Sequence, residues 1–172
     1  MSGRVTALLV FHRTKPFDEI KAALGKMAVT TKRAQSLAEA KHALAGANPP
    51  LLAVTESEFP DGKWSDIVSF SQKASSRVNV IVVGKTIDAN LYASAIEVGA
   101  FDYIAPPFEG MDLAHVVRCA LDNALARRET AKNSQPKEAP ESKIIYGWAV
   151  QRNISGESGV RDGCKSRDWG LG

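Results

Sequence analysis

Short apolar runs alternate with longer segments of helical spacing over the first 128 residues. The apolar runs, which are rich in β-branched residues, predict strands at residues 5–11, 27–31, 51–55, 79–83 and 101–104. The intervening segments predict helices at residues 16–24, 34–45, 64–75, 89–98 and 111–127. Because the strands are apolar on both sides and each is followed by a helix, the pattern predicts an α/β fold. We expect a doubly wound, five-stranded parallel sheet with five helices covering its two faces.

The character of the chain changes after residue 128. Residues 129–143 are polar and contain two prolines, which is typical of a linker. Residues 144–172 hold one apolar patch followed by a stretch of glycine, serine and charged residues, too few apolar positions to bury a second core. We therefore predict one domain at 1–128, a linker at 129–143 and a disordered tail at 144–172.

Composition narrows the class of protein. Hydrophobic residues make up 44% of the chain and charged residues 24%, as in ordinary globular domains. The net charge of +3 is spread along the sequence, so we do not expect direct nucleic-acid binding. No apolar run is long enough to span a membrane, and the two cysteines form no metal motif. Glycine-rich phosphate loops and HExxH motifs are absent from the sequence. We expect a cytoplasmic protein that does not contact a membrane and is not an enzyme.

Three strings of residues carry a resemblance to a known family. They are Leu-Leu-Ala-Val-Thr-Glu at 51–56, Phe-Pro-Asp-Gly at 59–62, and Gly-Ala-Phe-Asp-Tyr-Ile-Ala-Pro-Pro-Phe at 99–108. In order and spacing, residues 4–128 resemble the receiver domain of bacterial two-component response regulators. The resemblance implies a flavodoxin-like sheet with strand order 2-1-3-4-5. It also implies a role in phosphorelay signal transduction.

The resemblance also implies where the chemistry of receivers would lie. In that family, two acidic residues after the first strand and an Asp after the third hold Mg²⁺, and the Asp accepts a phosphoryl group. Here these positions fall on Phe11, His12 and Glu56. The family's sensing hydroxyl falls on Gly84, and its lysine falls on Pro106. Because every position departs from the family's pattern, we expect no metal site, no Mg²⁺ or other cofactor, and largely lost phosphorylation.

Several of these residues have two interpretations. Glu56 either mimics part of the phosphorylated state or is a hydrogen-bonded or solvated loop carboxylate. Lys85 either pairs with Glu56 as a compensating cation or stays solvated. His12 is either a loop residue or a hydrogen-bonded core residue on the one hand, or a ligand on the other. Tyr103 occupies the place of the receiver aromatic that changes between inward and outward positions; Gly84 leaves room for it inside, and the alternative is an ordinary packing aromatic.

Two functions follow from these patterns. The first is a pseudo-receiver that acts by protein–protein interaction or self-association, through the face of the fourth helix, fifth strand and fifth helix. The residues assigned to this face are Glu97, Asp102, Tyr103, Asp112, Arg118 and Asp122. The alternative is a flavodoxin-like domain that binds a small ligand or catalyses a reaction at the carboxyl edge of the sheet, using His12, Glu56 and Lys85.

Overall fold

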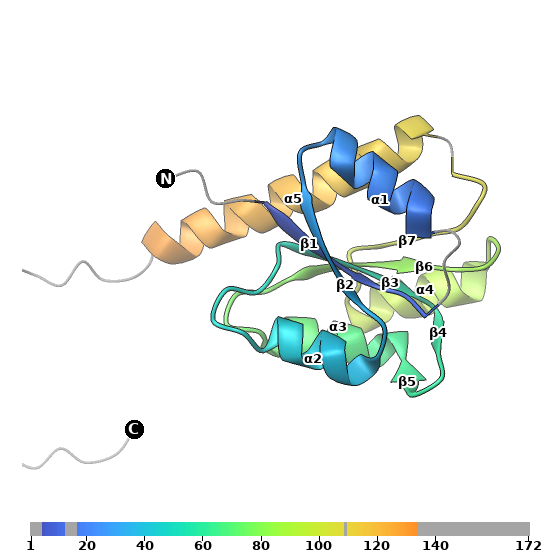
Figure 1. Cartoon of the computed structure of the whole chain (residues 1–172), viewed down its shortest axis with the longest axis horizontal. Coiled ribbons are helices and arrows are strands. Elements are labelled where there is room, and N and C mark those ends of the chain that lie inside the picture. The colour runs from blue at the N-terminus through green and yellow to red at the C-terminus, as the bar shows by residue number, and fades with distance from the viewer. Residues whose placement is uncertain (1–4, 13–16, 109, 134–172) are drawn as a thin grey trace, which may run out of the picture. The chain divides into compact units, whose positions relative to one another are not determined.

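Five parallel strands form the central sheet of the molecule (Figure 1). The computed structural model describes residues 5–12, 17–108 and 110–133. The sheet strands are β1 (Thr6–Val10), β2 (Thr30–Ala34), β3 (Leu52–Glu56), β6 (Asn79–Val83) and β7 (Asp102–Ile104). They lie in the order β2-β1-β3-β6-β7, all pairs parallel. Counted along the sheet alone, this is the order 2-1-3-4-5, so the predicted fold class is confirmed.

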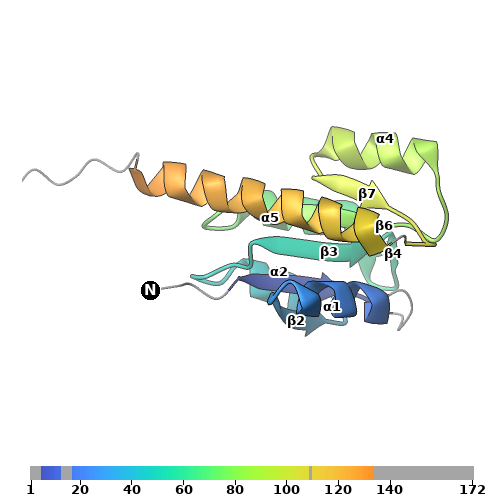
Figure 2. The same cartoon turned by 90° about the horizontal axis from the view of Figure 1, so that it is seen from above.

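Helices cover both faces of the sheet (Figures 1 and 2). They are α1 (Phe17–Lys26), α2 (Leu37–Leu44), α3 (Trp64–Lys73), α4 (Ala89–Val98) and α5 (Gly110–Asn133). Alternate residues of a strand point to opposite faces, so each strand contributes to two cores. Leu9 and Ile81 pack in one core with α1 and α5, while Leu8 and Val82 pack in the other with α2, α3 and α4.

The second strand lies three residues later than predicted. We expected a strand at 27–31, but Met27 and Val29 donate backbone hydrogen bonds to Leu24 and complete the turn that ends α1. Ala28 adopts a positive φ of 57° there. The true strand, Thr-Thr-Lys-Arg-Ala, is an edge strand with a largely exposed surface, so it lacks the apolar run of a central strand.

Two helix boundaries also differ from the predictions. The second helix begins at Leu37 and not at Ala34, which is the buried last residue of β2; Ser36 caps the helix through the backbone N–H of Glu39 at 3.2 Å. The fifth helix continues to Asn133, so residues 129–133, which we assigned to the linker, are helical. The rest of the predicted linker and the predicted tail lie outside the described residues.

A small hairpin that we did not predict follows β3. Its strands, β4 (Glu58–Phe59) and β5 (Gly62–Lys63), are joined by Pro60 and Asp61. The Asp61 carboxylate accepts the backbone N–H of Leu37 at 2.8 Å and so ties the hairpin to the start of α2. The hairpin places Glu58 beside the carboxyl edge of the sheet.

The described part of the chain contains no helix that is long and apolar enough to cross a membrane.

Candidate functional site

The candidate site lies at the carboxyl edge of the sheet, where the ends of four strands meet. Val10 pairs with Thr55, Glu56 with Val83, and Val83 with Ile104. Because parallel strands end at the same edge, the residues just after them become neighbours. The structure therefore brings the equivalents of the receiver site together: Phe11, His12, Glu56, Gly84, Tyr103 and Pro106.

Glu56 contacts the loop that follows β1. Its Oε1 accepts the backbone N–H of His12 in a short hydrogen bond. The side chain of His12 is exposed. Of the interpretations of His12, that of a loop residue fits this exposed position, since only its backbone contacts Glu56. Glu56 is half-buried and hydrogen-bonded to the backbone, which fits the interpretation of a hydrogen-bonded loop carboxylate, and it is not a partner of Lys85.

Phe11 belongs to the core and not to the loop. Its side chain is fully buried, and its ring packs edge-on against Phe17 with centroids 5.0 Å apart and planes at 77°. The backbone N–H of Phe11 also donates to the carbonyl of Ala34 at 3.1 Å, extending the pairing of β1 with β2. The first position of the receiver's acidic pair is thus filled by a core aromatic.

Lys85 does not pair with Glu56, so the predicted compensating cation is wrong. Its Nζ forms an ion pair with Oε2 of Glu58 on the hairpin, and both side chains are more than half exposed. An exposed pair of this kind contributes about 0–1 kcal/mol to stability. The His12, Glu56 and Lys85 cluster of the alternative ligand-binding function is therefore not assembled.

Tyr103 fills the space above Gly84. The tyrosine side chain is only 8% exposed, and a Cβ atom at position 84 would overlap its hydroxyl and lie 2.9 Å from Cε2 of its ring. Gly84 itself is held in place by its N–H, which donates to the carbonyl of Ile104 at 2.8 Å. The expected inward position of Tyr103, with Gly84 making room for it, is thus the one the structure adopts.

The hydroxyl of Tyr103 is tied to the loop before α4. It donates to the backbone carbonyl of Thr86 at 2.7 Å. Burial, and next the nearby carboxylate of Asp88, raise the pKa of Tyr103 above its ordinary value, which keeps the hydroxyl protonated as a donor. Asp88 also caps α4 by accepting the N–H groups of Asn90 and Leu91 at 2.9 and 3.1 Å. The hydrogen bond from the Tyr103 hydroxyl to Thr86 therefore joins β7 to the segment that precedes α4.

Pro106 takes the position of the receiver lysine and carries no charge. It is half-buried and precedes Pro107 through a cis peptide bond. The nearest cation along the neighbouring loop, Lys85, is paired with Glu58. Across the described ranges, no three His, Cys, Asp or Glu side chains gather into a group that could hold a metal ion.

The predicted interaction face needs two corrections. Arg118 lines a pocket between α1 and α5 together with Glu19 and Lys26, so it lies on the α1 side of α5 and away from α4. Tyr103 is buried beneath the face and does not form part of its accessible surface. Glu97, Asp112 and Asp122 are exposed, and Asp102 is half-buried. Four large apolar side chains on or near α4 are also exposed: Ile87 at 85%, Tyr92 at 49%, Ile96 at 41% and Val98 at 40%.

Sequence reasoning missed the partners in this region. Glu58 was not singled out from the sequence, although Glu-Phe-Pro-Asp-Gly-Lys has the turn residues of a hairpin. Thr86 contributes a backbone carbonyl, which no side-chain pattern can indicate. The exposed apolar residues Tyr92 and Ile96 stand four apart on one helix, and this spacing was the available sign of an accessible face.

Comparison with solved structures supports the fold. The receiver domain of a putative LuxO repressor from Vibrio parahaemolyticus superposes with a TM-score of 0.67 at 19% identity, covering 74% of this chain and 98% of that one. A receiver domain from Clostridium thermocellum gives a TM-score of 0.60 at 21% identity, with the same coverage. A scan against models of known protein families found no match.

Curated relatives decide the family. The response regulator PilR of Pseudomonas aeruginosa is 26% identical over 145 residues, which are 84% of this chain. The regulatory protein RegA of Rhodovulum sulfidophilum is 30% identical over 153 residues, covering 87% of this chain and 78% of RegA. The chain belongs to the response regulator family. Its described part is a receiver domain, and the chain spans 31% of the length of PilR.

Proposed function

We propose that this receiver domain signals by protein–protein contact and independently of phosphorylation at Glu56. The observation that carries the proposal is the position of the Tyr103 side chain directly over Gly84. In this family the aromatic at that place moves as the sensing hydroxyl moves. Here the hydroxyl is missing, and its space is taken by the tyrosine ring.

The residues of the site do not fit Mg²⁺. A hard cation of this kind needs several oxygen ligands, commonly carboxylates. The position of the first acidic residue holds the buried ring of Phe11, and Oε1 of Glu56 is engaged by the N–H of His12. Glu58, the other nearby carboxylate, is paired with Lys85. We therefore propose no step of this domain's function that passes through a bound metal.

In this proposal, the carboxylate of Glu56 mimics part of the phosphorylated state of a receiver. A glutamate is one methylene longer than the aspartate of receivers, so its charge reaches further toward the β1–α1 loop. Its hydrogen bond with the backbone of His12 connects the ends of β3 and β1. A charged acceptor for a backbone N–H contributes about 1.5–3 kcal/mol, and less where water competes, as at this exposed contact.

Incubation of the full chain with acetyl phosphate and Mg²⁺ tests the phosphorylation claim. Intact mass spectrometry should show no added phosphoryl mass on the wild-type chain. A Glu56→Asp variant should also stay unmodified, because Phe11 and Pro106 still remove the metal ligand and the cation. An added phosphoryl mass that disappears in a Glu56→Ala variant would contradict the proposal.

The face formed by α4, β7 and the adjoining side of α5 is the proposed contact surface. Its centre is apolar, with Tyr92 and Ile96 exposed, and its edge carries the acidic residues Glu97, Asp102 and Asp112. Neither α4 nor β7 contains a lysine or an arginine. Two copies would bring like charges together, so this chemistry favours a different protein with an apolar centre and a basic rim.

An Ile96→Asp variant tests this surface. Because Ile96 is 41% exposed but lies in the last turn of α4, where a carboxylate opposes the helix dipole, the change should lower the free energy of unfolding by only about 1 kcal/mol. We expect it to abolish capture of a partner that the wild-type chain retains in a pull-down. Ala38→Asp, on the exposed side of α2, is the matched control and should capture the same proteins as the wild type. Identical capture by both variants would show that the surface is misplaced.

A further inference from the structure

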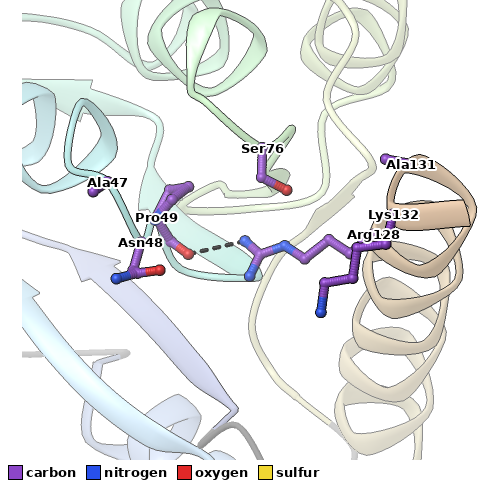
Figure 3. Close-up of a pocket in the computed structure, with 7 residues that line it drawn as sticks. All are labelled: Ala47, Asn48, Pro49, Ser76, Arg128, Ala131 and Lys132. Atoms are coloured by element: carbon purple, nitrogen blue, oxygen red, sulfur yellow. Dashed lines mark hydrogen bonds between the residues drawn. The ribbon is translucent and has the colours of Figure 1, made fainter. Parts of the chain in front are cut away.

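A second pocket opens at the opposite edge of the sheet, before the strands begin. It has a volume of about 330 Å³ and lies between the last turns of α5 and the loops that precede β3 and β6 (Figure 3). Its lining residues are Ala47, Asn48, Pro49, Ser76, Arg128, Ala131 and Lys132. None of these seven is acidic, and four of them carry side-chain hydrogen-bond donors.

Arg128 is held rigidly at the centre of this pocket. One terminal nitrogen, Nη2, donates to the carbonyls of Pro49 and Pro50 at 2.9 and 2.8 Å. Its Nε is buried and has no hydrogen-bond partner within the described part of the chain. Burial lowers the pKa of this guanidinium, although an arginine stays charged at neutral pH. The other terminal nitrogen faces the space beside Asn48 and Lys132 (Figure 3).

The surroundings add positive charge, and no acidic side chain lines the pocket; Glu129, the next residue on α5, is exposed and is not among the lining residues. Lys132 follows Arg128 by one helical turn, and its side chain lines the same pocket. Behind them, Arg127 donates to Asn79 at 2.8 Å, and its pKa is lowered by burial and next by the charge of Arg77. The helix dipole places about half a unit of negative charge at the C-terminal end of α5, and this charge repels an anion. The two positive charges of Arg128 and Lys132 are larger, so the net effect of the pocket is attraction.

We propose that this pocket binds a small phosphate-bearing anion, held by Arg128 and Lys132, with Ser76 and Asn48 as neutral donors. The donors approach from separate directions: Ser76 from one side of the guanidinium and Lys132 from the other (Figure 3). This arrangement suits tetrahedral phosphoryl oxygens better than a planar carboxylate, because Nη2 is already bound and a two-pronged arginine fork is not available. The volume exceeds that of one phosphate and accommodates a diphosphate group.

Titration calorimetry of the full chain with sodium pyrophosphate at constant ionic strength tests this site. We expect saturable binding that Lys132→Ala weakens about tenfold and Ser76→Ala weakens less. Lys21→Ala, which removes an exposed charge from α1, is the matched control and should leave the affinity unchanged. These variants spare Arg128, whose loss would also release the carbonyls of Pro49 and Pro50.

A comparison of the affinities for ADP and for pyrophosphate identifies the source of the phosphate. Tighter binding of ADP than of pyrophosphate would assign the pocket to a nucleotide, whereas equal binding would assign it to the diphosphate group alone. Absence of saturable binding of both compounds would overturn the proposal. Equal weakening by Lys132→Ala and Lys21→Ala would overturn it too, because that result would reflect general surface charge.

Discussion

A Gly84→Ala substitution is expected to lower the free energy of unfolding by about 2 kcal/mol, the cost of forcing extra volume into a packed core. The new Cβ would overlap the hydroxyl and ring of Tyr103, so the tyrosine would have to leave its place and break its bond to the Thr86 carbonyl. Gly84 does not adopt a positive φ, so alanine brings no backbone strain of its own. Urea denaturation measures the effect.

A double-mutant cycle separates the clash from any other effect at this position. In a Tyr103→Ala background the space is empty, so Gly84→Ala should then cost less than about 0.5 kcal/mol. Gly46→Ala is the matched control, since its Cβ would meet only the Ala43 carbonyl at 3.6 Å. If Gly84→Ala is equally costly with and without Tyr103, the two residues are not coupled, and the packing of the Tyr103 ring over Gly84 is not what position 84 depends on.

A Phe11→Asp substitution should unfold the domain, even though it restores an acidic residue at a receiver position. Loss of a buried phenylalanine costs about 3–5 kcal/mol, and burial of an unpaired carboxylate costs several more. Together these approach the total stability of a typical domain, about 5–15 kcal/mol. Circular dichroism should show loss of the cooperative transition. A folded Phe11→Asp variant with the wild-type midpoint would contradict the placement of Phe11 in the core.

His12→Asp is the matched control for that substitution. The side chain of His12 is exposed and only its backbone N–H contacts Glu56, so the variant should stay within about 0.5 kcal/mol of the wild type. The contrast between adjacent positions explains why the acidic pair cannot be regained by one change. Position 12 would accept a carboxylate, whereas position 11 has become part of the hydrophobic core.

The central strands were predictable because burial on both faces leaves an unbroken apolar run. The predicted strand at 79–83 coincides with β6, residue for residue. The edge strand β2 was misplaced because exposure permits Thr30, Lys32 and Arg33, which give no apolar signal. The fifth helix was predicted too short because its last turns carry no apolar stripe toward the sheet: Arg128 is half-buried but charged, and residues 129–133 are exposed.

Site geometry was predictable only where backbone position decides it. The placement of Glu56, Gly84 and Tyr103 at or near one edge of the sheet follows from strand order. The inward place of the tyrosine was one of two interpretations, since it depends on the rotamer of the side chain and not on the backbone. The ion pair of Lys85 depends on the hairpin that carries Glu58, and a long flexible lysine selects its partner by tertiary contact. The misplacement of Arg118 has a simpler cause, since it follows buried Val117 by 100° around α5, toward α1.

The central claim is that this receiver domain works independently of phosphorylation at Glu56. Its most direct test is whether the amide spectrum responds to an analogue of the phosphoryl group. We would record the nuclear magnetic resonance spectrum of the full chain with and without beryllofluoride and Mg²⁺. The amide signals of Glu56, Gly84, Thr86 and Tyr103 should not move, because the Tyr103 ring already fills the space above Gly84. Saturable shifts of these signals would show that the site still responds to phosphate chemistry, and would contradict the account.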